Sequence, residues 1–284
     1  MPPPWLIYPE LPCGSIGWRM GYAEDYLDQF NQWFNALNEH QQQIYNKQFP
    51  EPRQWQTTKN QTHFNSIFLW AENGTPAYSQ EKLLQASITQ EYIFFWGNQP
   101  DKDNKIKKTC LSQWWRSDFQ VNTESFCCVE QYMMSEKARL FEDQDSYQKI
   151  MLSKSQEEIK TLGRQVKNFD GKIWDKAKYT IVLNGNYYKF SQQKPLRDYL
   201  LETQNKILVE VSPHDKIWGI GLSEEDNNIS NPACWKGQNL LGLALMEVRD
   251  EIRRVYQNHD LINWDKVQPL LKRHVKLNQT KSAP

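Results

Sequence analysis

The segment CVEQYMMSEKARLFED places an acid and an amine at a helical spacing. If residues 128–141 form a helix, Glu130 and Lys137 share one face with Met133, Met134 and Phe141, because the helix repeats about every 3.6 residues. Burial in this apolar stripe favours the neutral lysine amine, the nucleophile that forms a Schiff base with an aldehyde or anomeric carbon. Glu130 is the candidate general acid and base. The alternative is a surface stripe, in which Lys137 reaches solvent and pairs with a carboxylate.

A second candidate is the segment SPHDKIWGIG, which follows a short apolar stretch. Asp215 supplies a carboxylate, Trp218 supplies an aromatic ring, and Gly219 allows the backbone to approach a ligand closely. The alternative is structural, with Asp215 capping a local Asx turn and Trp218 buried in the core. All three remain candidate site residues.

A third candidate is the segment LSQWWRSDF. Its adjacent tryptophans, Trp114 and Trp115, face different environments in any regular structure, so one of them is available to stack on a base. Core packing is the alternative for both rings. Ser112 and Phe119 lie in the same segment and are further candidate substrate-binding residues, whereas Arg116 is expected to be a solvated charge.

Periodic segments predict the elements that position these residues. Helical spacing covers residues 128–141, 156–166, 174–191, 195–202 and 240–257. Residues 91–97 read as a buried strand, and the alternation from Ile207 to Val211 predicts another. Many helices with a few strands that do not alternate regularly with them favour an α+β fold that is predominantly α-helical.

The composition of the sequence and the spacing of its apolar residues change near residue 88 and again near residue 258. We therefore expect an N-terminal extension over 1–88, a catalytic domain over 89–257 and a basic C-terminal tail over 258–284. In the extension, the spacing of apolar residues predicts one amphipathic helix over 22–44 and a strand over 66–70. Its aromatic face is expected to pack on the catalytic domain rather than to bind an external partner.

Composition argues against several classes of protein. The chain has 284 residues, with 34 Lys+Arg against 34 Asp+Glu, and this zero net charge disfavours bulk electrostatic coating of nucleic acid. The five cysteines include no CxxC pair, the five histidines are scattered, and no complete nucleotide-binding motif occurs, so we expect no metal and no cofactor. Adjacent Cys127 and Cys128 read as small buried residues. Without a membrane span or a signal peptide, a cytoplasmic location is expected.

Seven blocks of sequence together resemble the NADAR family of YbiA-like proteins, named for a predicted link to NAD and ADP-ribose chemistry. The resemblance covers about residues 90–255 and implies a YbiA-like fold and a metal-independent hydrolase of N-glycosidic bonds. Residues 1–88 lie outside it. The blocks, in order, are EYIFFWG, LSQWWRSDF, VEQYMMSEKARLFED, TLGRQV, IWDKAKY, LVEVSPHDKIWGIGL and GQNLLGLALMEVRDEI.

The resemblance implies a role for each residue that matches a family position. Glu130 and Asp215 match acidic positions of the family, and Lys137 matches the lysine that forms a Schiff base with the opened ribose. Trp174 matches a tryptophan suited to stacking, with helix core as its alternative. Arg164 matches an arginine whose fork-shaped guanidinium suits a phosphate or diphosphate, with a surface salt bridge as its alternative.

Two positions depart from the family pattern. Gln131 stands where a histidine usually follows the glutamate, which removes a proton-shuttling side chain from that position. Ile220 stands where some relatives carry aspartate, which removes a carboxylate from the ligand loop. Glu130 and Asp215 are therefore the expected acid pair.

The resemblance implies two substrate classes. Some members cleave phosphoribosylamino intermediates of riboflavin synthesis, and others remove ADP-ribose from guanine in DNA or in nucleotides. The N-terminal extension and the basic tail suit tracking of single-stranded DNA, and no fused enzyme of riboflavin synthesis is present, so the ADP-ribosyl substrate is the expectation. A third alternative is a non-catalytic sensor of ADP-ribose or a nucleotide in phage defence, with residues 1–88 binding an unidentified protein partner. Retention of Glu130 and Lys137 argues against the sensor.

Overall fold

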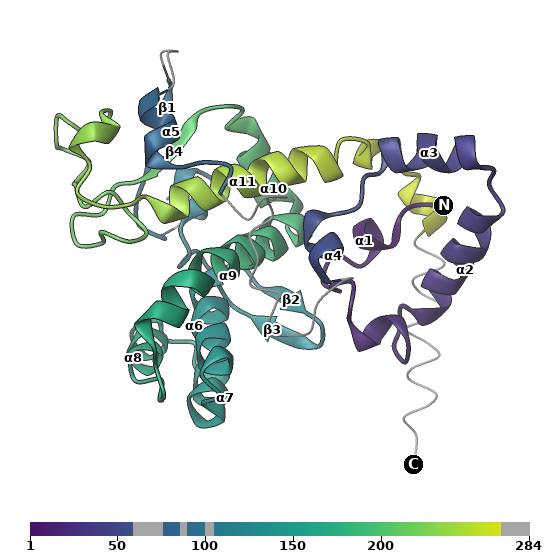
Figure 1. Cartoon of the computed structure of the whole chain (residues 1–284), viewed down its shortest axis with the longest axis horizontal. Helices are drawn as coiled ribbons and strands as arrows, with labels where there is room; N and C mark the ends of the chain where they lie inside the picture. Colours follow the sequence, from purple (N-terminus) through teal and green to yellow (C-terminus); the bar gives the residue numbers. More distant parts are fainter. Residues whose placement is uncertain (59–75, 86–89, 100–104, 268–284) are drawn as a thin grey trace.

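The structure is a computed structural model and describes residues 1–58, 76–85, 90–99 and 105–267. Within these ranges helices dominate, and two small two-stranded sheets accompany them (Figure 1), which confirms the expected α+β, predominantly α-helical class. The α-helices are α1 (Pro4–Ile7), α2 (Glu24–Asn35), α3 (Glu39–Gln48), α4 (Arg53–Thr58), α5 (Gln80–Gln85), α6 (Val129–Leu140), α7 (Gln144–Leu152), α8 (Gln156–Arg164), α9 (Gly171–Gln192), α10 (Lys194–Glu202) and α11 (Leu240–Val255). The strands are β1 (Tyr92–Phe95), β2 (Phe119–Val121), β3 (Glu124–Phe126) and β4 (Ile207–Glu210).

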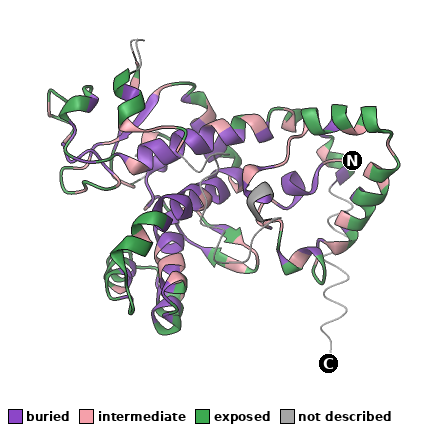
Figure 2. Ribbon diagram, in the orientation of Figure 1, coloured by how far each residue is buried: buried purple, intermediate pink, exposed green. Residues whose placement is uncertain are grey.

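Helix α9 lies at the centre of the fold, and both α6 and α11 pack on it. Its buried residues form a continuous band with those of α11, while α3 and the outer side of α8 face solvent (Figure 2). Asp170 starts α9, because its carboxylate accepts hydrogen bonds from the backbone N–H groups of Lys172 and Ile173 at 2.7 and 3.3 Å. The helices expected over 128–141, 156–166, 174–191, 195–202 and 240–257 are confirmed to within a few residues. The sequence did not predict α7, which begins after Asp143.

Strands β1 and β4 pair in parallel, with Phe95 opposite Glu210 at the end of the ladder. Helix α11 covers them closely because Gly242 has no side chain: a Cβ there would lie 2.0 Å from the carbonyl oxygen of Leu208. Asn239, immediately before α11, donates its Nδ2 to that same oxygen and accepts the Glu210 N–H at its Oδ1, both at 3.0 Å. These contacts fix the end of β4, where Glu210 and the SPHDKIWGIG loop begin.

The N-terminal extension differs from the prediction of one long helix. The chain breaks after Asn35 because Asn38 forms a capping box with Gln41: each side chain binds the backbone N–H of the other residue, at 2.9 and 3.0 Å, and starts α3. The aromatic face of α2 packs on α1, where the Tyr26 hydroxyl donates to the carbonyl of Pro2 at 2.8 Å. The expected strand over 66–70 and most of the basic tail lie outside the described residues.

The extension and the rest of the chain share one hydrophobic core, which includes residues of α1, α9 and α11. Polar contacts connect them as well. The Arg254 guanidinium in α11 donates to the backbone carbonyl of Glu51 at 2.8 Å, and Arg53 forms an ion pair of 3.6 Å with Glu251. The domain boundary at residue 88 stays a prediction.

Candidate active site

Lys137 lies in an aromatic slot beside α6. Its Nζ donates a hydrogen bond to the carbonyl oxygen of Gly163 at 2.7 Å, and it lies 4.3 Å from the ring centroid of Phe169 and 5.5 Å from that of Trp174. Burial lowers the pKa of Lys137, and the charge of Glu130 opposes that shift. A lowered pKa increases the fraction of neutral amine, which is the nucleophilic form.

The contact of α8 with α6 depends on Gly163. A Cβ at this position would lie 2.0 Å from the sulfur of Met134 and 2.7 Å from its Cγ. The absence of a side chain therefore allows α8 to approach α6 until the Gly163 carbonyl reaches Lys137. Ser155 starts α8, since its hydroxyl accepts the backbone N–H of Glu158 at 3.4 Å.

Glu130 occupies the first turn of α6, one residue after its start, and is 7% exposed. Burial raises the pKa of this carboxyl to about 8; the positive charges of Lys160 and Lys137 oppose the shift, and the negative charge of Asp215 adds to it. A carboxyl with that pKa is mostly protonated at neutral pH. It can therefore donate a proton to a leaving group and later accept one.

Glu210, at the end of β4, is a candidate site residue that the sequence analysis missed. Its Oε2 is buried without a hydrogen-bond partner among the described residues. Burial, together with the negative charges of Asp215 and Glu130, raises the pKa of Glu210 to about 8. Three carboxyl groups from α6, β4 and the following loop thus influence one another. A weak signal was available, because Glu210 directly precedes the loop that carries Asp215.

Asp215 forms the structural turn that its sequence left open, and its role toward a substrate stays a prediction. Its Oδ1 accepts the backbone N–H groups of Ile217 and Trp218, both at 2.8 Å, which is the expected Asx turn. Its charge also raises the pKa values of Glu130 and Glu210. The turn therefore holds a carboxylate next to two buried carboxyl groups.

Gly219 serves the packing of this loop. A Cβ there would lie 2.9 Å from the backbone oxygen of Glu210 and 3.1 Å from that of Asp215. The space next to Gly219 is therefore filled by protein backbone. Trp218 is half-buried and packs against the main core.

The WWRSDF segment lies largely inside the protein. Trp115 and Phe119 are 8% and 2% exposed, so core packing describes them better than substrate contact. Trp114 is half-buried against a small cluster that includes Cys127 and Cys128, both buried as expected. The Ser112 hydroxyl accepts the Trp114 backbone N–H at 3.1 Å. None of these contacts joins the segment to Lys137.

Lys189, a fully buried lysine of α9, fixes the start of this segment through two hydrogen bonds. Its Nζ donates to the carbonyl oxygens of Cys110 and Ser112 at 2.6 and 2.9 Å. Burial lowers its pKa to about 8. Ser112 therefore binds a protein side chain through its carbonyl, and Lys189 is a structural residue that the sequence analysis did not single out.

Gln131, at the usual histidine position, is also structural. Its Oε1 accepts the Cys127 backbone N–H at 2.8 Å, and its Nε2 donates to the carbonyls of Ile150 and Ser153 at 2.9 Å each. The side chain is 2% exposed and ties the start of α6 to the end of α7. At the position where the family usually has a titratable histidine, this protein therefore has an amide that forms structural hydrogen bonds.

Arg164 follows Gly163, whose carbonyl accepts the Lys137 hydrogen bond, and the Trp174 ring in α9 lies next to the Lys137 amine. Arg164 ends α8 and is exposed, and within the described part of the chain its guanidinium has no hydrogen bond or ion pair. The surface salt bridge considered for it is therefore absent there. Trp174 is half-buried, packs against the core cluster around Phe141 and faces Lys137, so it combines helix packing with a site position.

The described ranges contain no group of three His, Cys, Asp or Glu side chains arranged to hold a metal ion. The expectation of a metal-free site stays a prediction. Among the same residues, no helix has both the length and the apolarity that crossing a bilayer requires.

Comparisons with known proteins agree on one family. The model of the NADAR domain matches residues 94–253. An N-glycosidase of Acanthamoeba polyphaga mimivirus is 46% identical over 168 residues, which cover 57% of this chain and 97% of that protein. A chloroplastic riboflavin biosynthesis protein of Zea mays, PYRR, is 37% identical over 38% of this chain and 16% of its own length.

A solved structure of Escherichia coli YbiA is 25% identical, with a TM-score of 0.46 over 63% of this chain and 93% of that one. The resemblance drawn from the seven sequence blocks is confirmed by the matching family model, which spans α6, β4 and the loop between β4 and α11. Glu130, Lys137, Glu210 and Asp215 all lie within the matched residues. The chain belongs to the NADAR family, and we class it with its N-glycosidase relatives among the hydrolases of N-glycosyl bonds.

Proposed function

We propose that this protein removes ADP-ribose from guanine, in DNA or in a free nucleotide, by hydrolysing the bond between ribose C1 and the base nitrogen. One observation carries the proposal: Glu130 and Lys137 share one face of α6 and interact electrostatically, and Glu130 also interacts with Asp215 and Glu210. A carboxyl that keeps its proton at neutral pH and an amine with a lowered pKa are the two groups that such a cleavage needs.

The first half of the reaction breaks the glycosyl bond. Protonated Glu130 donates its proton to the leaving base nitrogen while the neutral Lys137 amine attacks C1. The bond from C1 to the base breaks, and the base leaves with its electron pair and the added proton. Opening of the ribose ring, with proton transfer from the new C–N centre to the ring oxygen, then leaves an imine between Lys137 and C1.

The second half consumes one water molecule. The Glu130 carboxylate takes a proton from water as the oxygen adds to C1, and that proton then passes to the lysine nitrogen. The new hydroxyl on C1 then gives its proton to Glu130 as the bond between C1 and the Lys137 nitrogen breaks, which releases ADP-ribose and regenerates both the amine and the protonated carboxyl. Glu210, whose pKa is also raised to about 8, is the neighbouring group that shares protons with Glu130 in this cycle.

Substrate contacts are assigned from the side chains that surround Lys137. Arg164 binds a phosphate of the diphosphate, since its exposed guanidinium has no partner among the described residues and forms paired hydrogen bonds with phosphate oxygens. Trp174 stacks on the substrate next to the amine, and Asp215 orients ribose hydroxyls. Trp218 lies on the same loop as Asp215 and completes the aromatic contacts. Single-stranded DNA is the proposed partner of the basic tail.

The test is release of ADP-ribose from guanine-ADP-ribosylated single-stranded DNA, followed by mass spectrometry. Wild type is compared with Lys137→Ala and with the matched control Lys149→Ala, an exposed lysine of α7 paired with Asp145. We expect release by wild type and the control only. Borohydride added during turnover should link the sugar to Lys137. Turnover without any adduct would indicate that water attacks C1 directly and that no imine forms.

A second candidate substrate is a phosphoribosylamino intermediate of riboflavin synthesis, favoured by the similarity to the maize riboflavin biosynthesis protein. The same acid and amine act on either substrate, because both reactions free a nitrogen from ribose C1. A parallel assay with that intermediate separates the two. If neither substrate is cleaved but ADP-ribose binds equally to wild type and Lys137→Ala, the protein is a sensor.

A further inference from the structure

The ring of Phe169 lies beside the Lys137 amine, in the segment between α8 and α9. Its centroid is 4.3 Å from Nζ, and the side chain is 48% exposed. The sequence analysis did not single out Phe169, and the reaction proposed above assigns it no role. An aromatic side chain that contacts the proposed nucleophile and is open to solvent is placed to meet a substrate.

The protein fixes the position of this ring. The buried ring of Phe141, at the end of α6, meets it edge to face, with centroids 5.2 Å apart and planes at 64°. Before the ring, the Lys167 backbone N–H donates to the Asp143 carboxylate at 2.8 Å, and after it Asp170 caps α9. Contacts within the protein therefore hold the Phe169 ring beside Nζ.

The reacting carbon has to come close to the same ring. Attack by Nζ needs ribose C1 within about 3.5 Å, and the bond that then forms is about 1.5 Å long. Because the Phe169 centroid is 4.3 Å from Nζ, a bonded C1 lies within about 6 Å of that centroid. Aromatic faces attract cations over this range. A positive charge on either atom of the new bond is therefore within reach of the ring.

Lys137 gains a positive charge when its neutral amine attacks C1. The nitrogen is first a secondary ammonium, and after the ribose ring opens the charge is shared between nitrogen and C1 of the protonated imine. We propose that the face of Phe169 stabilises this charge, which makes Phe169 a further catalytic residue. This inference rests on the proposed function, because it takes Lys137 as the nucleophile. Trp174, whose centroid is 5.5 Å from Nζ, adds a more distant contact of the same kind.

The ring acts on the resting enzyme too, which makes its effect depend on pH. Where Lys137 is already an ammonium, the ring stabilises that ammonium and the protonated imine alike, so the advantage cancels. Where Lys137 is neutral, the imine alone carries the charge and the full advantage appears. Burial lowers the pKa of Lys137 and brings this second regime closer to neutral pH, whereas the charge of Glu130, on the same helix, opposes that shift. Against the amine, α8 presents the Gly163 carbonyl and α9 the Trp174 ring, and the charge of Lys160 in α8 acts on Glu130.

The test replaces Phe169 with 3,4,5-trifluorophenylalanine, which nearly keeps the shape of the ring and makes its face much less negative. Ribose 5-phosphate is the probe, because its aldehyde forms an imine with an amine and cyanoborohydride reduces that imine to a stable adduct. Peptide mapping by mass spectrometry measures the adduct at Lys137, with exposed Lys149 of α7 as the internal reference. We expect fluorination to slow labelling of Lys137 about three- to tenfold at alkaline pH and less than about twofold at weakly acidic pH.

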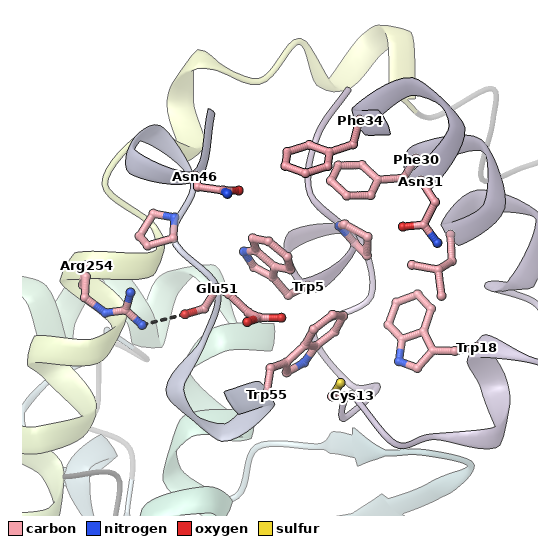
Figure 3. A pocket seen from close by; sticks show the side chains of 13 residues that line it. Trp5, Cys13, Trp18, Phe30, Asn31, Phe34, Asn46, Glu51, Trp55 and Arg254 are labelled. Carbon is pink, nitrogen blue, oxygen red and sulfur yellow. Dashed lines mark hydrogen bonds between the residues drawn. The ribbon is translucent and has the colours of Figure 1, made fainter. Parts of the chain in front are cut away.

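The same replacement at Phe34 is the matched control. Phe34 is half-buried and lines a separate cavity of about 620 Å³ in the N-terminal extension, whose lining includes neither Phe169 nor Lys137 (Figure 3). Labelling of Lys137 in this protein should match wild type. Phe169→Leu, which keeps an apolar side chain without an aromatic face, should slow labelling at alkaline pH at least as much as fluorination does. Phe169→Tyr, which keeps the face, should label like wild type.

Two results would overturn the proposal. Labelling of Lys137 that fluorination leaves unchanged at alkaline pH would show that Phe169 only packs. An equal loss at weakly acidic and alkaline pH would show that fluorine changes access to the amine rather than the stability of its charge.

The assay also separates this inference from the proposed function. If Lys137 is labelled in the expected pattern but ADP-ribosylated DNA is not cleaved, the proposed function is wrong and the role of Phe169 toward the imine stands. If Lys137 of wild type is labelled no faster than Lys149, Lys137 is not the nucleophile and both proposals fail.

Discussion

The candidate active site and the cavity of the N-terminal extension contain different kinds of side chains. At the active site, Glu130, Glu210 and Lys137 are ionisable groups whose pKa values burial shifts toward neutrality. Around the cavity, aromatic rings dominate and Arg254 forms an ion pair with Glu251. Proton transfer needs groups poised between two charge states, whereas packed rings stabilise the fold through buried apolar area.

A comparison of two lysines of the family-matched segment, half-buried Lys137 and fully buried Lys189, adds to this contrast. Lys189 is fixed by two backbone carbonyls in the interior, and Lys137 by one carbonyl at the edge of an aromatic slot that is half open to solvent. Both pKa values are lowered by burial. Lys137 is influenced by the carboxyl of Glu130, whereas Lys189 is influenced by the thiols of Cys110 and Cys128, so a shifted pKa alone does not identify the candidate nucleophile.

The largest expected effect is that of Lys137→Ala, which removes the nucleophile. Turnover should fall by about 1,000-fold or more, while circular dichroism and thermal unfolding stay close to those of wild type, because the side chain is only partly buried. Lys149→Ala should keep full activity. Equal loss in both variants would show that the assay reports general destabilisation.

Glu130→Gln should lower kcat by about 100-fold, because an amide cannot donate and accept the proton. The dependence of kcat on pH tests the role of Glu130 more specifically. In wild type, kcat should fall above pH 8, where Glu130, with its pKa raised to about 8, loses its proton. This limb should disappear in Glu130→Gln and persist in the exposed control Glu157→Gln; persistence in the first variant would assign the acid to another group.

Gly163→Ala should lower activity by about tenfold by pushing α8 away from α6. The new Cβ meets the sulfur of Met134, which lies 2.0 Å from its ideal position. An overpacked contact of this kind costs about 1–3 kcal/mol of stability. The double variant Gly163→Ala with Met134→Ala should recover part of the activity, and failure of this rescue would indicate that the helix spacing does not position Lys137.

Glu210→Gln is expected to change stability in a pH-dependent way. Burial raises the pKa of Glu210 to about 8, so between pH 4.5 and 8 the unfolded chain loses this proton first and the folded protein becomes less stable as pH rises. Glutamine removes this loss. The variant should therefore melt about 3 °C or more above wild type at pH 8, with no advantage at pH 4.5. A difference in melting temperature between the variant and wild type that does not depend on pH would contradict the burial of an ionisable Glu210.

Local patterns sufficed for much of the active site. Helical periodicity placed Glu130 and Lys137 on one face of α6, and the residue types of SPHDKIWGIG predicted the Asx turn at Asp215. The two-residue alternation identified β4, and the order of the seven blocks identified the family. The helix face, the turn and the strand depend on contacts between residues a few positions apart, so short segments of sequence are enough to predict them.

Other features required the assembled chain. Glu210 became a buried carboxyl only when α6 and the following loop closed over the end of β4, and Phe119 became core because α6 and α9 surround it. Trp5, Trp18 and Trp55 come from separate elements before residue 56, and nothing in their spacing predicts that they meet. Sequence therefore determined which groups were available and which face of each element they share. Tertiary structure decided which of them became buried, and burial sets the pKa of a carboxyl or an amine.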